Sequence, residues 1–352
     1  MRIKKIQIKN FKSLVDFELI DLKSFCAFVG PNASGKSNIF EALELLNFFF
    51  LYGRNAPDFF GGKENFLSYK SNNEMLFYDI NFESGVRIFY EFSFTSNQKG
   101  DTFLGVKSVL VDGLVLSDYS DKEKRMKAID VASRRGIKYQ NDFEQFIDNF
   151  SRVFVGKSLL NKKPTVNGKL AADASNLSSI IGRILEDQEK RSDFIEWLRI
   201  IIPEFKDIEV KKSNIDGSFE FFIFEKGSNK PFPKYLISDG TYNILALMTA
   251  VYQNNEPQFL CIEEPENGLH PQAIQLLVDF FREKCEEKGH HIWLNTHSQT
   301  LVRCLEIDEV ILVNKHNGQT SASQMTKADN IDLKTDEAWL SNALGGGILW
   351  SK

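Results

Sequence analysis

The sequence predicts an α/β fold with a mixed, largely parallel central sheet, an antiparallel lobe and a helical insertion. Three short apolar runs, residues 25–29, 259–262 and 291–295, favour buried strands of a parallel sheet. Residues 75–117 instead alternate apolar and polar side chains between glycine-containing turns, which is typical of antiparallel strands. From about residue 120 to 202, apolar side chains recur at helical spacing.

The first apolar run leads into a phosphate-binding loop. Residues 30–37 read GPNASGKS, which fits the pattern GxxxxGK[ST], and helical spacing follows. The glycines let successive N–H groups turn toward a polyphosphate above the positive end of the helix, so we expect a bound nucleoside triphosphate. Lys36 would reach the β and γ phosphates, and Ser37 would bind Mg²⁺. The expected nucleotide contacts here are Gly30, Asn32, Ser34, Gly35, Lys36, Ser37 and Asn38.

The second apolar run ends in the acidic tetrapeptide of residues 263–266, EEPE. A carboxylate at the tip of a strand beside a phosphate loop can hold Mg²⁺, and its neighbour can activate the attacking water. We therefore expect Glu263 on the metal and Glu264 as the general base. Acidic turns are also common after strands, so this tetrapeptide alone leaves both interpretations open.

Two further segments favour the catalytic interpretation. The third apolar run ends at residues 296–298, THS, and places His297 at the same sheet edge, where it can sense a γ-phosphate. Three further histidines, His290, His291 and His316, are expected to be structural. Residues 238–241, SDGT, precede an apolar helix, and such a helix start is a second anion-binding site. Since the chain has its own phosphate loop, the second site is expected to serve a neighbouring molecule's nucleotide.

The order of these four motifs resembles the ABC-type ATPases of the SMC, RecF and OLD group. The resemblance covers residues 1 to about 52 and about 234 to 315, and the opening IQIKNFKSLVDFELIDLKSFCAFVGPNASGKSNIFEAL is especially similar. It implies an ABC-type ATPase head that binds ATP and Mg²⁺ in a homodimer, or in a higher assembly of dimers. By the same resemblance, Lys12 and Ser13 lie near the base or sugar. Ser238, Asp239 and Gly240 form the signature motif, residues 267–271 the dimer-contacting loop, and His297 the switch histidine.

The sequence departs from that group's common pattern in three respects. Glu263 stands where aspartate is usual, and the signature reads SDGT rather than SGGQ. No glutamine loop is identifiable.

We expect four regions along the chain. Residues 1–52 and 206–352 form the two parts of the ATPase head, residues 53–118 the antiparallel lobe, and residues 119–205 a helical, basic insertion. One helical face there is expected to carry Phe143, Phe146, Ile147 and Phe150. Sustained heptads are absent, which argues against long coiled-coil arms.

Charge is uneven along the chain. It carries 43 basic and 48 acidic residues, a net charge of −5, yet residues 119–170 hold 12 basic and 6 acidic side chains. This basic segment could contact a nucleic-acid backbone, and an ordinary solvated helical face explains it equally well.

The remaining composition favours a cytoplasmic protein without a membrane partner. The four cysteines are scattered without metal-ligand spacing, and no apolar segment opens the chain. The terminal residues 338–350 place apolar side chains around three glycines, and resemble the ends of bacterial stand-alone ATPases that work beside an effector in phage defence. A tail that packs on its own core fits equally well.

Three functions compete on the sequence. The first is a sensor and scaffold ATPase that gates a separate nuclease or toxin in anti-phage defence. The second is a RecF-like DNA repair or loading factor. The third, a transporter's nucleotide-binding subunit, fits the opening segment and the long insertion poorly.

Overall fold

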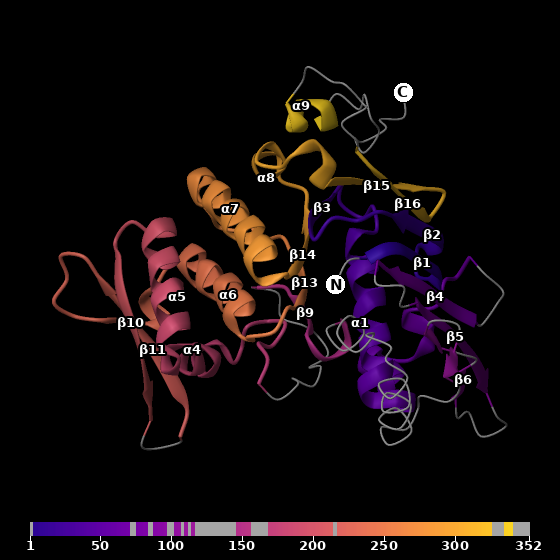
Figure 1. The fold of residues 1–352 in the computed structure, drawn as a ribbon, viewed down its shortest axis with the longest axis horizontal. Helices are drawn as coiled ribbons and strands as arrows, with labels where there is room; N and C mark the ends of the chain where they lie inside the picture. The colour runs from indigo at the N-terminus through magenta and orange to yellow at the C-terminus, as the bar shows by residue number, and fades with distance from the viewer. Residues whose placement is uncertain are drawn as a thin grey trace.

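The computed structural model describes most of the 352-residue chain, and Figure 1 shows its arrangement. The described residues are 3–70, 75–83, 87–96, 102–106, 109–111, 114–116, 146–155, 168–213, 217–325 and 334–340.

A six-stranded sheet forms the centre of the molecule, with the order β16-β15-β3-β14-β13-β9. Five of its strands run parallel, and β16 pairs antiparallel with β15 at one edge. The prediction of a mixed, largely parallel core sheet is therefore confirmed. The strands are β3 (Phe25–Val29), β9 (Phe150–Val153), β13 (Phe259–Glu263), β14 (His291–Thr296), β15 (Val310–His316) and β16 (Gln319–Gln324).

Strand β3 is buried on both faces, which explains its uninterrupted apolar sequence. Because side chains alternate along a strand, Cys26 and Phe28 join a core on the side of helix α1 (Lys36–Tyr52). Phe25, Ala27 and Val29 join a second core with the helices of the opposite face. Those helices are α6 (Asp239–Tyr252) and α7 (Pro271–Lys288), which lie beside each other in Figure 1.

An antiparallel sheet packs on the α1 side, with the order β2-β1-β4-β5-β6. Its first two strands precede the phosphate loop in sequence, so the N-terminal segment and residues 75–106 form one sheet. A two-stranded ribbon, β7 with β8, follows. The strands are β1 (Ile3–Phe11), β2 (Leu14–Ile20), β4 (Met75–Phe82), β5 (Arg87–Ser96), β6 (Thr102–Val106), β7 (Val109–Val111) and β8 (Leu114–Leu116).

A separate lobe of helices and a three-stranded sheet lies at the far end of the molecule from α1 (Figure 1). It contains α4 (Leu177–Glu186), α5 (Gln188–Ile201), β10 (Phe205–Lys212), β11 (Phe219–Glu225) and β12 (Phe232–Pro233). Two short helices complete the description: α8 (Gln299–Arg303) lies between β14 and β15 in sequence, and α9 (Thr335–Leu340) follows β16.

The structure differs from the sequence prediction at one residue of the segment that precedes this lobe. Phe150 was expected on a helical face with Phe146 and Ile147, but it begins β9, the edge strand beside β13. The ring centroid of Phe150 lies 5.6 Å from that of Phe259, so packing and pairing with β13 override the helical pattern. Phe143 and most of residues 119–170, which carry the predicted nucleic-acid contact, lie outside the described residues.

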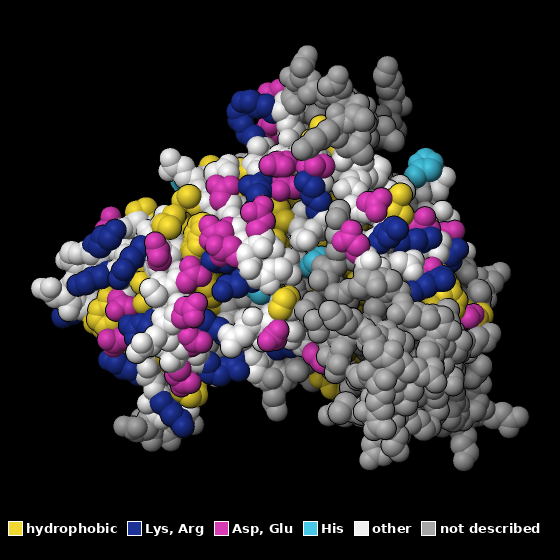
Figure 2. All heavy atoms as spheres, viewed as in Figure 1, with side chains coloured by type: hydrophobic (Ala, Val, Ile, Leu, Met, Phe, Trp, Pro, Cys, Tyr) yellow, Lys and Arg dark blue, Asp and Glu magenta, His cyan; other side chains and the backbone are white. Residues whose placement is uncertain are grey.

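The described surface mixes charges of both signs. In Figure 2, basic and acidic side chains are interspersed over α5, β10 and β11. Within the described ranges, no helix is both long and apolar enough to cross a bilayer.

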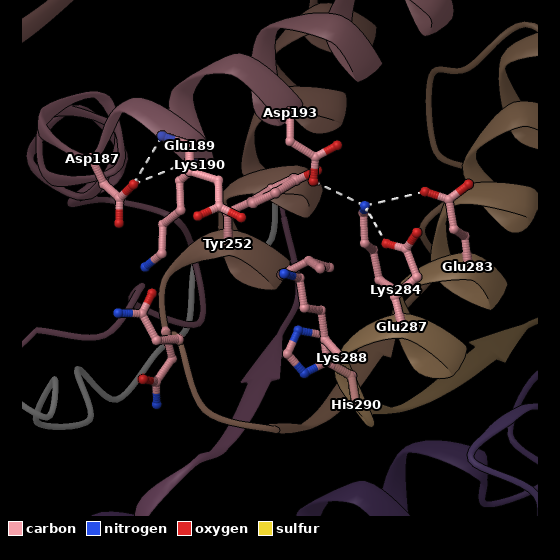
Figure 3. Close-up of a pocket in the computed structure, with 13 residues that line it drawn as sticks. Asp187, Glu189, Lys190, Asp193, Tyr252, Glu283, Lys284, Glu287, Lys288 and His290 are labelled. Atoms are coloured by element: carbon pink, nitrogen blue, oxygen red, sulfur yellow. Dashed lines mark hydrogen bonds and ion pairs between the residues drawn. The ribbon is translucent and has the colours of Figure 1, made fainter.

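His290 and His291 are buried, as a structural role requires, whereas His316 at the end of β15 is exposed. The Nδ1 atom of His290 accepts a hydrogen bond from the backbone N–H of Gln258 at 3.1 Å. Burial, together with nearby Lys288 and Lys284, lowers the pKa of His290 from 6.5 to about 4. Figure 3 shows this ring below Lys284, at the wall of a pocket among α5, α6 and α7.

The depressed pKa of His290 makes stability sensitive to acid. The unfolded chain takes up the proton near pH 6.5 and the folded chain only near pH 4, so the free energy of unfolding should fall as pH falls between these values. The loss attributable to this group should approach about 3 kcal/mol. Denaturant titrations of wild type and His290→Asn from pH 7.5 to 4 measure it, because asparagine keeps an acceptor without titrating. An equal acid-induced loss in both proteins would contradict the assignment.

Candidate nucleotide site

The phosphate loop connects the end of β3 to the start of α1, and its backbone needs glycine at two positions. Gly35 has a φ of 101°, and a Cβ atom there would lie 2.0 Å from Oγ1 of Thr320. A Cβ on Gly30 would lie 2.2 Å from the carbonyl oxygen of Val313. The loop is therefore held tightly against β15 and β16, which leaves its inner side to a ligand.

A pocket of about 280 Å³ opens at this loop. It unites most of the predicted phosphate contacts with the predicted general base, although these residues lie more than 200 positions apart in sequence. Its lining consists of Asn32, Ala33, Ser34, Gly35, Lys36, Ser37, Asn38, Glu264, Asn295 and Lys315.

Lys36 lies over the loop. Its Nζ donates hydrogen bonds to the carbonyl oxygens of Gly30 and Pro31, at 2.8 and 2.9 Å. Burial lowers the pKa of Lys36 from its ordinary value, while the carboxylates of Glu264, Glu266 and Glu263 act in the opposite direction. These carbonyl contacts hold the ammonium at the mouth of the loop, where it can exchange them for phosphate oxygens.

Ser37 and Glu263, the two predicted metal ligands, are in contact. The Ser37 hydroxyl donates to Oε2 of Glu263 at 2.6 Å, and the side-chain amide of Asn295 donates to Ser37 Oγ at 3.1 Å. Glu263 pairs in register with Asn295, which belongs to the strand between β13 and β3. A hydroxyl and a carboxylate are oxygen ligands of the kind Mg²⁺ prefers.

The other oxygen of Glu263 is held by Arg152, a residue counted above as part of the basic segment. Arg152 donates from Nε to Oε1 of Glu263 at 2.6 Å and from Nη1 to Oε2 of Glu44 at 2.9 Å. Its side chain is only 8% exposed, so it is not available to a nucleic acid. Burial alone would lower the pKa of Arg152, but Glu263, Glu44 and Glu41 hold it above its ordinary value.

Glu264 follows β13 in a left-handed conformation, with a φ of 48°. Its backbone N–H donates to the carbonyl of Asn295 at 2.8 Å, and this turn directs the side chain to the pocket. His297 Nδ1 lies 3.8 Å from Oε1 of Glu264. Asn267 donates to the second carboxylate oxygen at 3.0 Å. The predicted base and the predicted switch histidine are thus neighbours.

Lys12 and Ser13, predicted near the base or sugar, are engaged elsewhere. Ser13 is 3% exposed, and its hydroxyl pairs with Oγ1 of Thr320 at 2.7 Å. Asn38 donates to the same hydroxyl at 2.7 Å, so Ser13 supports the loop from behind. The contact of Ser13 with the base or sugar stays a prediction. Lys12 forms an ion pair with Glu41 on α1.

The SDGT segment lies apart from the phosphate-loop pocket, since Ser238, Asp239 and Gly240 do not line it. Ser238 caps α6 by accepting a hydrogen bond from the backbone N–H of Thr241 at 3.1 Å. A Cβ on Gly240 would lie 2.5 Å from the carbonyl oxygen of Gly268, so this glycine permits close contact with the predicted dimer-contacting loop. The helix start faces solvent.

Several residues of the site escaped the sequence analysis: Arg152, Asn295, Lys315 and Thr320. Thr320 donates through Oγ1 to the carbonyl of Ser34 at 2.8 Å and so fixes the loop. Asn295 carried a usable signal, because it ends an apolar strand beside the THS motif. The others carry none, since their contacts depend on strand pairing between distant segments.

Comparison with known proteins supplies the family. A family model described as "AAA domain, putative AbiEii toxin, Type IV TA system" matches residues 25–303. The chain belongs to this family. A segment of 41 residues is 54% identical to the chromosome partition protein Smc of Methanocaldococcus jannaschii, and it covers 12% of this chain and 4% of that protein.

Solved structures with a similar fold include SMC head domains. The Thermotoga maritima SMC head matches with a TM-score of 0.50 and 17% identity, over 93% of this chain and 100% of that one. An SMC head bound to the C-terminal winged-helix domain of ScpA matches with a TM-score of 0.60 and 16% identity, over 94% and 100%. The Pyrococcus furiosus SMC head with an extended coiled coil, bound to the C-terminal domain of ScpA, gives 0.56 and 14%, over 94% and 97%.

The family and fold confirm an ABC-type, SMC-like P-loop ATPase head. The site has the chemistry that a nucleotide with Mg²⁺ requires. The hydroxyl of Ser34, at the loop's inner turn, is buried and finds no hydrogen-bond partner within the described ranges. Those ranges also contain no cluster of three or more His, Cys, Asp or Glu side chains suited to a metal. A single carboxylate with a serine fits Mg²⁺ that is bound largely through phosphates and water.

Proposed function

We propose that the chain hydrolyses ATP with Mg²⁺, using Glu264 as the general base. The observation that carries this proposal is that Glu264 lines the same pocket as Lys36 and Ser37. A base must lie within reach of a water beside the γ-phosphate, and the turn after β13 directs this carboxylate there. His297, 3.8 Å from Glu264, is suited to orient that carboxylate and to contact the γ-phosphate.

Ser37 and Glu263 would hold Mg²⁺, which would neutralise charge on the β and γ phosphates. Lys36 would bind the same phosphates from the opposite side of the loop. The backbone N–H groups of residues 32–37 would complete the binding of the triphosphate.

Glutamine at the two adjacent glutamates should separate their roles. Glu264→Gln should bind ATP normally and hydrolyse it roughly 100-fold more slowly or worse, because it loses only the base. Glu263→Gln should instead weaken the Mg²⁺ dependence of ATP binding, and Lys36→Ala should weaken binding with or without metal. Calorimetric titrations in Mg²⁺ and in EDTA, with single-turnover hydrolysis, make the comparison. Rapid hydrolysis by Glu264→Gln would exclude it as the base.

We also propose that ATP holds two copies together head to tail. Ser238 and Gly240 lie at the N-terminal end of an exposed helix, a position suited to an anion, and they lie outside the chain's own pocket. Gly240 abuts Gly268 in the loop that follows Glu264, so a partner's γ-phosphate at this helix start would be coupled to the base. Higher assemblies of such dimers fit the same contact.

Ser238→Arg should bind ATP but remain monomeric and hydrolyse slowly, because a long side chain would block the partner's phosphate. Mixing it with Lys36→Ala should restore one composite site per dimer, formed from the intact loop of one copy and the intact helix start of the other. Sedimentation and ATPase assays of the mixture measure this, with Ser228→Arg in an exposed turn as control. Full activity of monomeric Ser238→Arg would rule out the sandwich.

The dimer's biological role is proposed to be that of a sensor and scaffold that gates a separately encoded nuclease or toxin in anti-phage defence. Support comes from the family description, which names a putative toxin of a type IV toxin–antitoxin system. The SMC heads of similar fold bind a separate protein, ScpA, through its C-terminal domain. A partner protein on this head would follow the same principle.

Phage challenge tests that role. Cells that express the chain with its neighbouring genes should resist infection, and Lys36→Ala or Glu264→Gln should abolish resistance without lowering protein abundance. Plaque counts on isogenic strains provide the measurement. Equal plaquing with and without the intact chain would reject the defence role and leave the ATPase proposal standing.

A further inference from the structure

Arg152 lies at the centre of a buried group of charges beside the proposed metal carboxylate. It sits on β9 opposite Cys261 of β13, one strand outward from the strand that carries Glu263. Its guanidinium contacts Glu263, Glu44 and Glu41, the last at 3.5 Å. The side chains of Arg152, Glu44 and Glu263 are 8%, 7% and 1% exposed, so water screens these contacts little.

The helix after the phosphate loop aligns its own polar residues toward this arginine. Ser37, Glu41 and Glu44 are spaced four and three residues apart on α1, which places them along one face. Ser37 reaches Oε2 of Glu263, while Glu44 reaches Arg152. The face therefore contacts both partners of the Arg152–Glu263 pair.

The two oxygens of Glu263 have different partners. Oε1 is held by the guanidinium of Arg152, and Oε2 faces the hydroxyl of Ser37. A guanidinium presents a planar, rigid set of donors, so it fixes the plane of a carboxylate better than an ammonium can. With Oε1 occupied in this way, only Oε2 is presented to the side where a metal would bind.

We propose that Arg152 is a positioning residue for the magnesium site: it holds one oxygen of Glu263 so that the other is directed toward Ser37 and the metal. This inference rests on the proposed function. It assigns to Arg152 an effect on Mg²⁺ dependence and none on the phosphate loop itself. Arg152 does not touch the nucleotide, since it lies behind Glu263 and does not line the pocket.

A conservative substitution tests the geometry rather than the charge. Arg152→Lys keeps the positive charge but cannot hold Glu263 and Glu44 together in the same plane. In EDTA, its affinity for ATP should stay within about twofold of wild type. The Mg²⁺ concentration at which ATP binding is half-maximally strengthened should rise roughly 10- to 100-fold, because this is the usual effect of losing a residue that orients a metal ligand. Titrations of ATP at graded Mg²⁺ concentrations measure both quantities.

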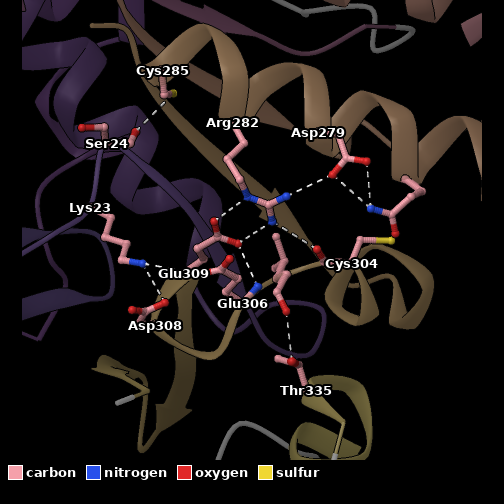
Figure 4. Close-up of polar contacts among 12 residues, drawn as sticks. Lys23, Ser24, Asp279, Arg282, Cys285, Cys304, Glu306, Asp308, Glu309 and Thr335 are labelled. Carbon is pink, nitrogen blue, oxygen red and sulfur yellow. Dashed lines mark hydrogen bonds and ion pairs between the residues drawn. The ribbon is translucent and has the colours of Figure 1, made fainter. Parts of the chain in front are cut away.

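Arg282 offers a matched control. Figure 4 shows this second arginine on α7, between Glu309 and Asp279. Arg282 does not line the phosphate-loop pocket. It donates to both oxygens of Glu309, each at 2.9 Å, so Arg282→Lys disrupts a similar partly buried contact. The midpoint of thermal unfolding of Arg282→Lys should fall, while the Mg²⁺ dependence of its ATP binding should match wild type. An unchanged Mg²⁺ midpoint in Arg152→Lys, with a thermal loss like that of Arg282→Lys, would overturn the inference and leave Arg152 a structural residue.

A second variant covers a failure of Arg152→Lys to fold. The double variant Arg152→Gln, Glu44→Gln removes one charge of each sign and keeps hydrogen-bonding groups of similar size. It should show the same Mg²⁺ shift, and a wild-type Mg²⁺ midpoint in this protein would also overturn the inference. Wild-type protein that binds no ATP with or without Mg²⁺ would instead refute the proposed function, so the two failures are distinguishable.

Discussion

Parallel pairing of β3, β14 and β13 is the constraint on which the site depends. Parallel strands place their carboxyl ends at one edge of a sheet, so residues after Val29, Thr296 and Glu263 meet although the chain separates them widely. Strand β14 lies between β3, which leads into the phosphate loop, and β13, which ends at Glu263. On β14, Asn295 connects the two neighbouring strands: its side-chain amide donates to Ser37, and its backbone pairs in register with Glu263. A slip of this register by one residue would turn Glu263 to the other face of the sheet.

The local parts of this arrangement could be predicted from sequence because each is encoded in adjacent residues. The phosphate loop requires glycine at positions whose backbone is tight or left-handed, and Gly30 and Gly35 stand at those positions. Buried parallel strands read as unbroken apolar runs, and residues 25–29 and 259–263 are buried throughout. The fold class followed from these signals and is confirmed by the similarity to SMC heads.

The supporting residues could not be predicted, because their roles come from contacts across the fold. Arg152 belongs to a stretch rich in lysine and arginine, where a surface role is the ordinary interpretation. Only the pairing of β9 with β13 buries it against Glu263. Ser13 illustrates the same limit. The family resemblance implied a nucleotide contact for Ser13, but no local pattern indicated that its hydroxyl also pairs with that of Thr320, 307 residues away.

The energetics of the Arg152 group explain why such an arrangement is unusual in a protein core. Removing charges from water costs several kcal/mol per ion, and attraction between the partners offsets this only with good geometry. Apolar side chains of similar size often stabilise a core equally well, so stability alone is a weak reason for Arg152 to occupy this position.

Glu263 must stay charged and buried if it is to hold a metal beside Ser37, and a buried carboxylate needs a compensating cation. Arg152 supplies that cation from the side opposite the phosphate loop. Glu41 and Glu44, from the same helix as Ser37, then fix the arginine's orientation. The contacts that place a cation beside the buried carboxylate of Glu263 therefore also orient that carboxylate toward Ser37 and the proposed metal site.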